Sequence, residues 1–294
     1  MHQFLSSIGF SGILKREDLE LLLDDVIQNP SNMVICENND DTNFAEISKE
    51  YGPYFGIAVR GDFDKNRKFR MEYFFPYFLG KGISVYDEAT VEKYSEKNSY
   101  AGICSDVNDA MNVIFYLQNA VEYQNTIQGK SVKPTPNSCT FSGLSKKAMI
   151  ILPIEKEELS KKRKNGSSTD RSSLIAAAKE GDETAIEQLA LDDLDIYSSL
   201  SKRVESEDLY SIIESTFMPF GIEGDQYTVI GEIIDVDLFE NSFSNEKVWA
   251  MTLSVNGMDF DICVNQNDLL GEPKIGRRIK SVIWLQGTVN FPAL

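Results

Sequence analysis

The sequence has little of the residues on which the commonest catalytic designs depend. It contains one histidine, His2, among 294 residues. A Ser-His-Asp triad, a Cys-His pair or a multi-histidine metal site would have to use this residue, which we expect to be mobile because it lies at the N-terminus. The sequence therefore argues strongly against these chemistries.

The four cysteines are scattered and none belongs to a Cys-x-x-Cys pair. This spacing excludes zinc ribbons and thioredoxin-type redox motifs. Buried, reduced thiols are the ordinary interpretation, and they suit a reducing compartment. The residues are Cys36, Cys104, Cys139 and Cys263.

Long apolar runs are missing as well. No stretch of about 18 uninterrupted apolar residues is present, so we expect no membrane span. The N-terminus lacks a basic region, and the charged residues 15–18 end its apolar stretch. We therefore expect no secretory signal and a cytoplasmic location.

Negative charge is what the chain has in excess, with a formal net charge of −17. Residues 156–173 are the exception, because six basic minus three acidic residues give +3. Residues 160–173 contain no apolar side chain, and such a segment cannot offset its ordering entropy by burial. We predict a basic, disordered linker over 156–173. The alternative is a patch at Lys161–Lys164 for an acidic partner or nucleic acid.

Helix and strand patterns mix before this linker. Apolar residues at helical spacing predict helices at 16–28 and 106–124. We expect two further strands at 139–144 and 148–153, turning at 145–147. Between the two helices, β-type runs predict an antiparallel meander with strands at 33–36, 44–47, 54–59 and 68–78.

These elements favour an α+β domain over residues 1–155, with helices on one face of an antiparallel sheet. Residues 174–217 are rich in helical stripes and predict a small helical subdomain that extends to Phe217. Residues 174–220 carry a net charge of 3 − 11 = −8, which argues against phosphate contact.

From Tyr227 onward the hydrophobic period changes to two. Alternation predicts a strand at 227–237, a hairpin at 248–264 turning at Asn256-Gly257, and a last strand near 278–291. Asp259, Asp261, Cys263 and Asn265 are expected on a solvated face of the hairpin. We predict an OB-like β-barrel over residues 218–294.

Two Asp-x-Asp pairs lie on predicted strands of this barrel. Asp235 and Asp237 project from one face, and Asp259 and Asp261 do the same on another strand. Paired carboxylates can bind a divalent cation or share acid–base work. The alternative, which we favour, is a solvated polar face.

The last strand offers a candidate binding surface. Alternation places Arg278, Lys280, Trp284 and Gln286 on the face opposite the aliphatic residues. A tryptophan beside cations suits stacking on a base or another ligand. The alternative is a face that another part of the chain covers.

An aromatic run over residues 69–78 is the densest apolar cluster. A ligand pocket lined by Tyr73 and Tyr77 is one interpretation. Packing of a central strand buried on both faces is the other, and we favour it.

Six segments spread over nearly the whole chain carry a family resemblance: 2–10, 56–61, 72–76, 114–119, 268–278 and 284–287. Together they resemble an uncharacterised domain-of-unknown-function family of clostridial proteins, numbered 3881. The resemblance implies a cytosolic bacterial protein and supplies no catalytic residues.

Three functions remain from the sequence. We favour a non-enzymatic binding or scaffold protein that docks a protein or a small ligand, with no cofactor. One alternative is a metal-dependent enzyme that uses the strand carboxylates. The other is single-stranded nucleic-acid binding by the barrel, which the net charge disfavours. We expect no membrane partner, and the oligomeric state stays open.

Overall fold

The computed structural model describes residues 2–37, 43–93, 99–106, 111–130, 133–151, 184, 215–222 and 224–292. Residues 1–151 and 215–294 form one compact unit, and residues 152–214 form a second. The predicted linker, and the predicted helical subdomain up to residue 214 except Thr184, lie outside the described residues.

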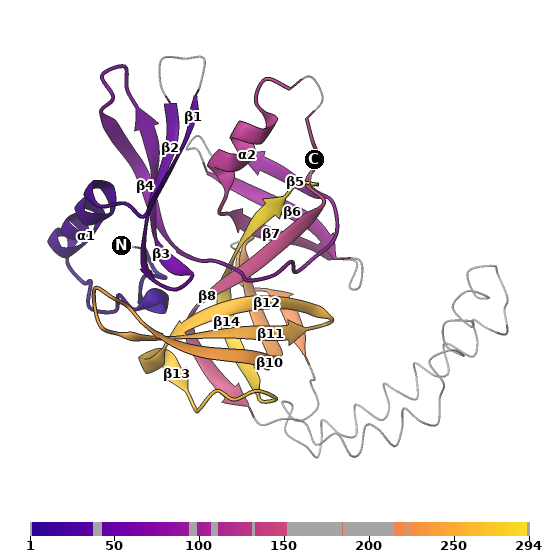
Figure 1. Ribbon diagram of the computed structural model, residues 1–294. Coiled ribbons are helices and arrows are strands. Elements are labelled where there is room, and N and C mark those ends of the chain that lie inside the picture. The colour runs from indigo at the N-terminus through magenta and orange to yellow at the C-terminus, as the bar shows by residue number, and fades with distance from the viewer. Residues whose placement is uncertain are drawn as a thin grey trace. The chain divides into compact units, whose positions relative to one another are not determined.

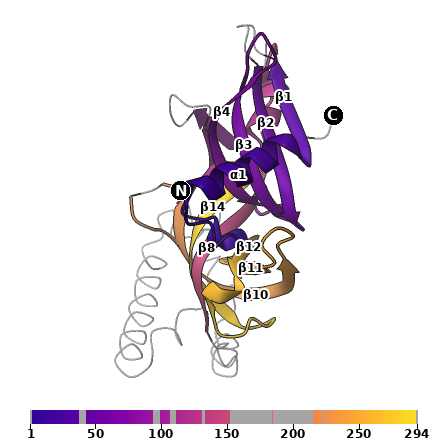
Figure 2. The same cartoon turned by 90° about the vertical axis from the view of Figure 1, so that its left-hand side faces the viewer.

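A four-stranded antiparallel sheet contains the predicted meander. Its strands follow chain order: β1 (Asn32–Glu37), β2 (Asn43–Gly52), β3 (Phe55–Phe63) and β4 (Phe69–Phe78). The predicted helix at 16–28 is confirmed as α1 (Arg16–Gln28), which buries Leu22, Leu23 and Val26. Figure 2 shows α1 crossing this sheet, with the strands continuing past the helix.

The helix predicted at 106–124 is wrong. The chain forms β5 (Ala89–Lys93), β6 (Tyr100–Asp106) and β7 (Met111–Leu117), and only then α2 (Ala120–Ile127). Val113–Leu117 is an unbroken run of β-branched, aromatic and aliphatic residues, which suits a strand buried on both faces. The helical spacing of a few apolar residues was coincidental, because an unbroken run satisfies either period.

Five strands close into a β-barrel (Figure 1): β8 (Ser138–Ile151), β12 (Met258–Asn265), β11 (Lys247–Val255), β10 (Gln226–Glu240) and β14 (Arg278–Asn290). β14 pairs with β8 and so closes the ring. Neighbours are antiparallel except β12 and β8, which are parallel. The predicted hairpin is confirmed, and Asn256 and Gly257 both have positive φ, as a two-residue turn needs.

β8 corrects two predictions. It is one continuous strand, without the turn expected at 145–147, because β14 pairs with it from Ser138 to Ile151. It also brings a strand from the N-terminal half into the barrel, so the barrel is not confined to residues 218–294. The helical stripe expected to reach Phe217 is likewise wrong there, since Thr216–Pro219 forms β9 beside β10.

Short elements complete the described fold: the 3-10 helices η1 (Ser6–Ile8) and η2 (Gln266–Asp268), and β13 (Leu269–Leu270) beside β8. Beyond the barrel, β14 pairs with β7 at Gln286–Gly287, and β7, β6 and β5 continue the sheet. None of the helices that the structure describes is long and apolar enough to cross a bilayer.

Two large hydrophobic clusters, and a small third one of Cys36, Phe44 and Val121, hold these elements together. The first fills the barrel interior, and the second joins the four-stranded sheet, α1 and η1 to the barrel's outer face. The second cluster overturns the solvated face predicted for the hairpin. Cys263 and Asn265 are fully buried because residues Phe4–Ile8 pack over this end of β12. Asp261 is 3% exposed, and it accepts hydrogen bonds from the Lys81 backbone N–H and the Thr252 hydroxyl.

Candidate functional site

The Trp284 face is covered. Trp284 is 7% exposed, and its Nε1 donates to Asp225 Oδ2 at 2.7 Å. Its ring lies against Phe4 and His2, with centroids 5.5 and 4.9 Å apart. A base therefore has no open ring on which to stack.

His2 corrects a further expectation, because it is packed rather than mobile. Besides Trp284, its ring contacts Phe74 edge-on at 6.1 Å. Burial, followed by the nearby α-amino group and Lys146, lowers the pKa of His2 to about 4. The single histidine is thus neutral at physiological pH.

The other residues of the predicted binding face differ in how far they are buried. Arg278 is 4% exposed and Lys280 is half-buried. Gln286 is fully buried, where its Oε1 accepts from Gln118 Nε2 at 2.7 Å. The two amides also bind β4 backbone: Gln118 donates to the Phe78 carbonyl at 2.8 Å, and Gln286 to the Pro76 carbonyl at 2.9 Å. The pair therefore fixes the end of β4 against β14.

Tyr73 and Tyr77 lie on the face of β4 that points toward the larger sheet. Tyr77 is 6% exposed, and the Tyr73 hydroxyl accepts from Arg60 Nη1 at 3.2 Å. Burial raises the pKa of Tyr77 above its ordinary range. Both tyrosines belong to the packed layer between the two sheets.

Arg60 is the central residue of that layer, and sequence reasoning missed it. It is fully buried, and the facing aromatic and acidic groups keep its pKa raised despite burial. The available signal was a lone cation in the otherwise apolar run Phe55–Gly61. Its five N–H groups donate to Glu46 Oε2 (2.6 Å), the Tyr73 and Tyr116 hydroxyls (3.2 and 3.1 Å), and the Leu117 and Gln118 carbonyls (3.1 and 2.5 Å).

Three of the four predicted metal-site carboxylates converge on Lys81. Its Nζ lies 3.0 Å from Asp235 Oδ2 and 3.1 Å from Asp237 Oδ2, and its backbone N–H donates to Asp261 Oδ2 at 2.6 Å. Partial burial opposes the charge, yet the hydrogen bonds that Lys81 donates to both aspartates raise its pKa. Lys81 thus already supplies the countercharge that a cation would bring.

Asp259 stays apart from these three. It is exposed and stands opposite Ser254 in the hairpin register. Among the described residues, no group of three or more His, Cys, Asp or Glu side chains is arranged to hold a metal ion.

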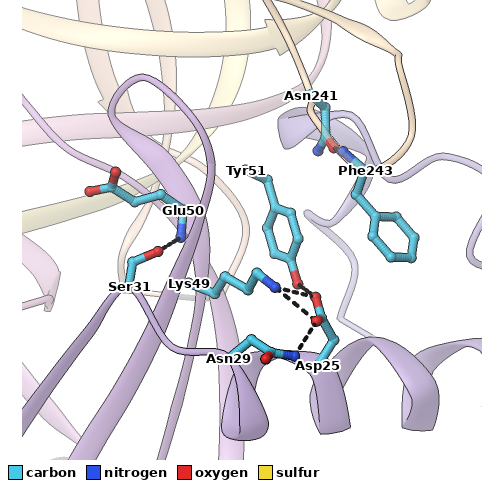
Figure 3. A network of polar contacts seen from close by, with 8 residues as sticks. All are labelled: Asp25, Asn29, Ser31, Lys49, Glu50, Tyr51, Asn241 and Phe243. Atoms are coloured by element: carbon cyan, nitrogen blue, oxygen red, sulfur yellow. Dashed lines mark hydrogen bonds and ion pairs between the residues drawn. The ribbon is translucent and has the colours of Figure 1, made fainter.

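Figure 3 shows a second polar network, between α1 and β2. Asp25 accepts from Lys49 Nζ at 2.7 and 2.8 Å, from the Tyr51 hydroxyl at 3.1 Å and from Asn29 Nδ2 at 3.0 Å. Burial alone would raise the pKa of Asp25, but these donors lower it. The network anchors α1 on the sheet and leaves the Lys49 side chain 22% exposed.

An apolar surface lies on the same side of the sheet as α1, past the helix. Register places Ile35, Ala45, Gly61 and Met71 in one row across the four strands. Met33, Ile35 and Met71 are 44%, 41% and 43% exposed, and the Phe63 and Phe69 rings lie 5.2 Å apart. We call Met33, Ile35, Phe63, Phe69 and Met71 the distal apolar face.

Opposite charges border this face. The β3–β4 turn and the start of β4 carry exposed cations, whereas the outer side of α1 carries exposed acids. The cations are Lys65, Arg67, Lys68 and Arg70, and the acids are Glu17, Glu20 and Asp24.

A family model described as a domain of unknown function, from an E. rectale gene description (DUF3881), matches residues 5–287. The chain belongs to this family. The resemblance noted from sequence segments is therefore confirmed. No curated protein and no solved structure matches the chain.

Proposed function

We propose that this DUF3881 protein is a non-enzymatic binding or scaffold protein that docks an amphipathic helix of a partner protein on the distal apolar face. The observation that carries the proposal is that one face of the four-stranded sheet is half covered by α1 and half open. The open half presents five apolar side chains.

The covered half indicates what the open half accepts. α1 places Leu22, Leu23 and Val26 on this face, so a helix already fits the twist of these strands. A second helix laid beside α1 would bury Ile35 and Met71 in the same manner. Helix-in-groove recognition uses such apolar anchors at helical spacing.

The border charges define the partner further. Glu17, Glu20 and Asp24 are exposed on α1, where Glu20 already accepts from Arg16 Nε at 2.8 Å. Lys65, Arg67 and Lys68 are exposed at the β3–β4 turn. The fitting partner carries basic residues on its α1 side and acidic residues near the turn. Such complementarity sets orientation and association rate more than affinity.

The barrel supports binding elsewhere less well. We propose that it is an OB-type barrel in which β8 takes the place of the last strand. The β10–β11–β12 meander and the parallel pairing of β12 with β8 support this assignment. OB barrels bind ligands on the face of their second and third strands. Here those strands are β11 and β12, and Phe4–Ile8 packs on that face.

A labelled, designed amphipathic helix with this charge pattern tests the proposal by fluorescence anisotropy. We expect saturable binding that the double variant Ile35→Asp/Met71→Asp weakens by at least about tenfold. Leu270→Asp is the matched control, because Leu270 is a 69% exposed apolar residue of β13, and it should leave binding unchanged.

Three results would contradict the proposal. The first is that the double variant binds the helix with the same affinity as the wild-type protein. The second is that the wild-type protein binds neither the helix nor its charge-reversed form. The third is a concentration-dependent dimer in sedimentation equilibrium that Ile35→Asp/Met71→Asp dissociates. A second copy of the chain would then occupy the distal apolar face.

A further inference from the structure

The distal apolar face contains two exposed methionines. Met33 and Met71 are 44% and 43% exposed, and Met218 of β9 is 55% exposed. The other methionines whose side chains the structure describes are partly or fully buried: Met149, Met251 and Met258. All four cysteines are buried as well. Among the described sulfur side chains, an oxidant in solution therefore meets Met33, Met71 and Met218 first.

Met33 and Met71 lie at opposite edges of the four-stranded sheet. Met33 belongs to β1 and Met71 to β4, the first and last strands of this sheet. Register places Met71 in one row with Ile35, and Met33 lies two residues from Ile35 on the same side of β1. A helix that crosses all four strands spans three strand spacings, about 14 Å or roughly ten residues, and so contacts both thioethers.

A thioether and a sulfoxide have different effects on such a contact. The unbranched, polarisable methionine side chain adapts to irregular apolar surfaces. Its sulfoxide carries a polar oxygen, and burying that oxygen against an apolar helix face without a hydrogen-bond donor is unfavourable. Oxidation of Met33 and Met71 thus makes two of the five apolar side chains of the face polar.

We propose that Met33 and Met71 are sites of reversible oxidation, and that their oxidation weakens the docking of a helix on the distal apolar face. This inference rests on the proposed function. A two-electron oxidant of the peroxide class transfers one oxygen atom to each Sδ. The peroxide O–O bond breaks, an S–O bond forms, and the second oxygen leaves as water with both peroxide hydrogens. Methionine sulfoxide reductases reverse the step, because a dithiol is oxidised to a disulfide and the sulfoxide oxygen leaves as water.

Docking and oxidation oppose each other at this surface. A docked helix covers Met33 and Met71, so it should slow the formation of sulfoxide at both residues. It should leave the rate at Met218 unchanged, because β9 belongs to the other sheet. Linkage requires both effects, since a modification that weakens binding is itself disfavoured by binding.

The wild-type protein is treated with hydrogen peroxide under native conditions, and peptide mapping locates each sulfoxide as a mass gain of about 16 Da. We expect gains at Met33, Met71 and Met218 before any at Met251 and Met258, with the cooperative thermal transition retained. The designed amphipathic helix, made without methionine, should then bind roughly tenfold more weakly than it binds the untreated protein. Reductases that act on both sulfoxide epimers should restore the affinity.

Met33→Leu/Met71→Leu and Met218→Leu are the matched variants, and each is compared with its own untreated form. Leucine has an apolar side chain of similar volume and no sulfur to oxidise. Peroxide should therefore not change the affinity of the double variant for the helix. Met218→Leu should remain as sensitive to peroxide as the wild-type protein.

The untreated wild-type protein separates the two proposals. If it does not bind the helix, the proposed function fails and this inference fails with it. If it binds, but the affinity stays the same after both methionines are oxidised, only this inference is wrong. The inference is equally wrong if peroxide weakens binding by Met33→Leu/Met71→Leu as much as by the wild-type protein, or if Met33 and Met71 stay unoxidised where Met218 is fully converted.

Discussion

At the scale of single residues, His2 shows how the core changes the chemistry of a side chain. Its ring packs against Phe4, Phe74 and Trp284, and burial lowers its pKa from 6.5 to about 4. Because the folded pKa lies below the unfolded one, the unfolded chain binds a proton more readily. Stability is therefore fully present above about pH 6.5 and decreases as the pH falls toward 4.

This shift predicts a measurable pH dependence. Between about pH 7.5 and 5, His2 should cost the wild-type protein about 2 kcal/mol of unfolding free energy. Urea unfolding at both pH values measures it, and His2→Phe should remove most of this loss. An equal loss in the variant would contradict the assigned pKa.

Trp284 marks the limit of local sequence patterns for single residues. Alternation along the last strand correctly predicts that Trp284 lies opposite the aliphatic residues Ile279 and Ile283. What covers it is Phe4 and His2, about 280 residues earlier in the chain. Because period-two patterns carry no information about such distant contacts, an open binding face and a covered one look alike in sequence.

At the scale of elements, the sequence predicted helices and strands correctly where clear turn or helix-stop residues mark their ends. α1 ends at Asn29-Pro30, the four-stranded meander has polar turns, and Asn256-Gly257 fixes one hairpin. The failures are β7, whose unbroken apolar run fits either period, and β8, whose polar residues 145–147 resemble a turn. β7 and β8 are paired along buried neighbours, and tertiary pairing decides their conformation.

Arg60 connects the four-stranded sheet to β7, a strand of the other sheet, with which it shares no backbone ladder in the described part of the chain. Its guanidinium joins β2 and β4 to the end of β7, and it lies 4.6 Å from the Phe75 ring centroid. A planar group with five donors matches these acceptors, and an ammonium does not.

Arg60→Lys should therefore destabilise the protein by about 3–5 kcal/mol, because buried acceptors and the Glu46 carboxylate lose their donors. Thermal unfolding measures the change. Arg70→Lys is the matched control at an exposed position of β4, and it should change stability by less than about 0.5 kcal/mol. Similar small effects of both substitutions would show that Arg60 is not the connection between the sheets.

At the scale of the whole molecule, the barrel combines strands from two separate stretches of the described chain. β8 closes the ring between β12 and β14, although more than 70 residues separate it from β10 (226 − 151 = 75). No composition signal before the linker distinguishes β8 from the strands of the first sheet. The expected boundary near residue 155 thus marks where a strand of the barrel ends.

This arrangement predicts the behaviour of fragments. Residues 215–294 expressed alone should lack a cooperative thermal transition and dispersed amide resonances, since the barrel has an unpaired gap where β8 belongs. Co-expression with residues 1–155 should restore both. A folded, cooperative 215–294 fragment would contradict the role assigned to β8.

The distance between β8 and its partners also governs how the protein is made. Ser138 precedes Arg278 by 278 − 138 = 140 residues, so a ribosome elongating at roughly 5–20 residues per second needs about 7–30 s to deliver β14 after β8. For most of that interval the fourteen-residue strand, which is largely buried in the folded protein, has neither of its barrel neighbours, β12 and β14. The nascent chain therefore exposes a binding segment for holdase chaperones, and translation speed becomes a determinant of its yield.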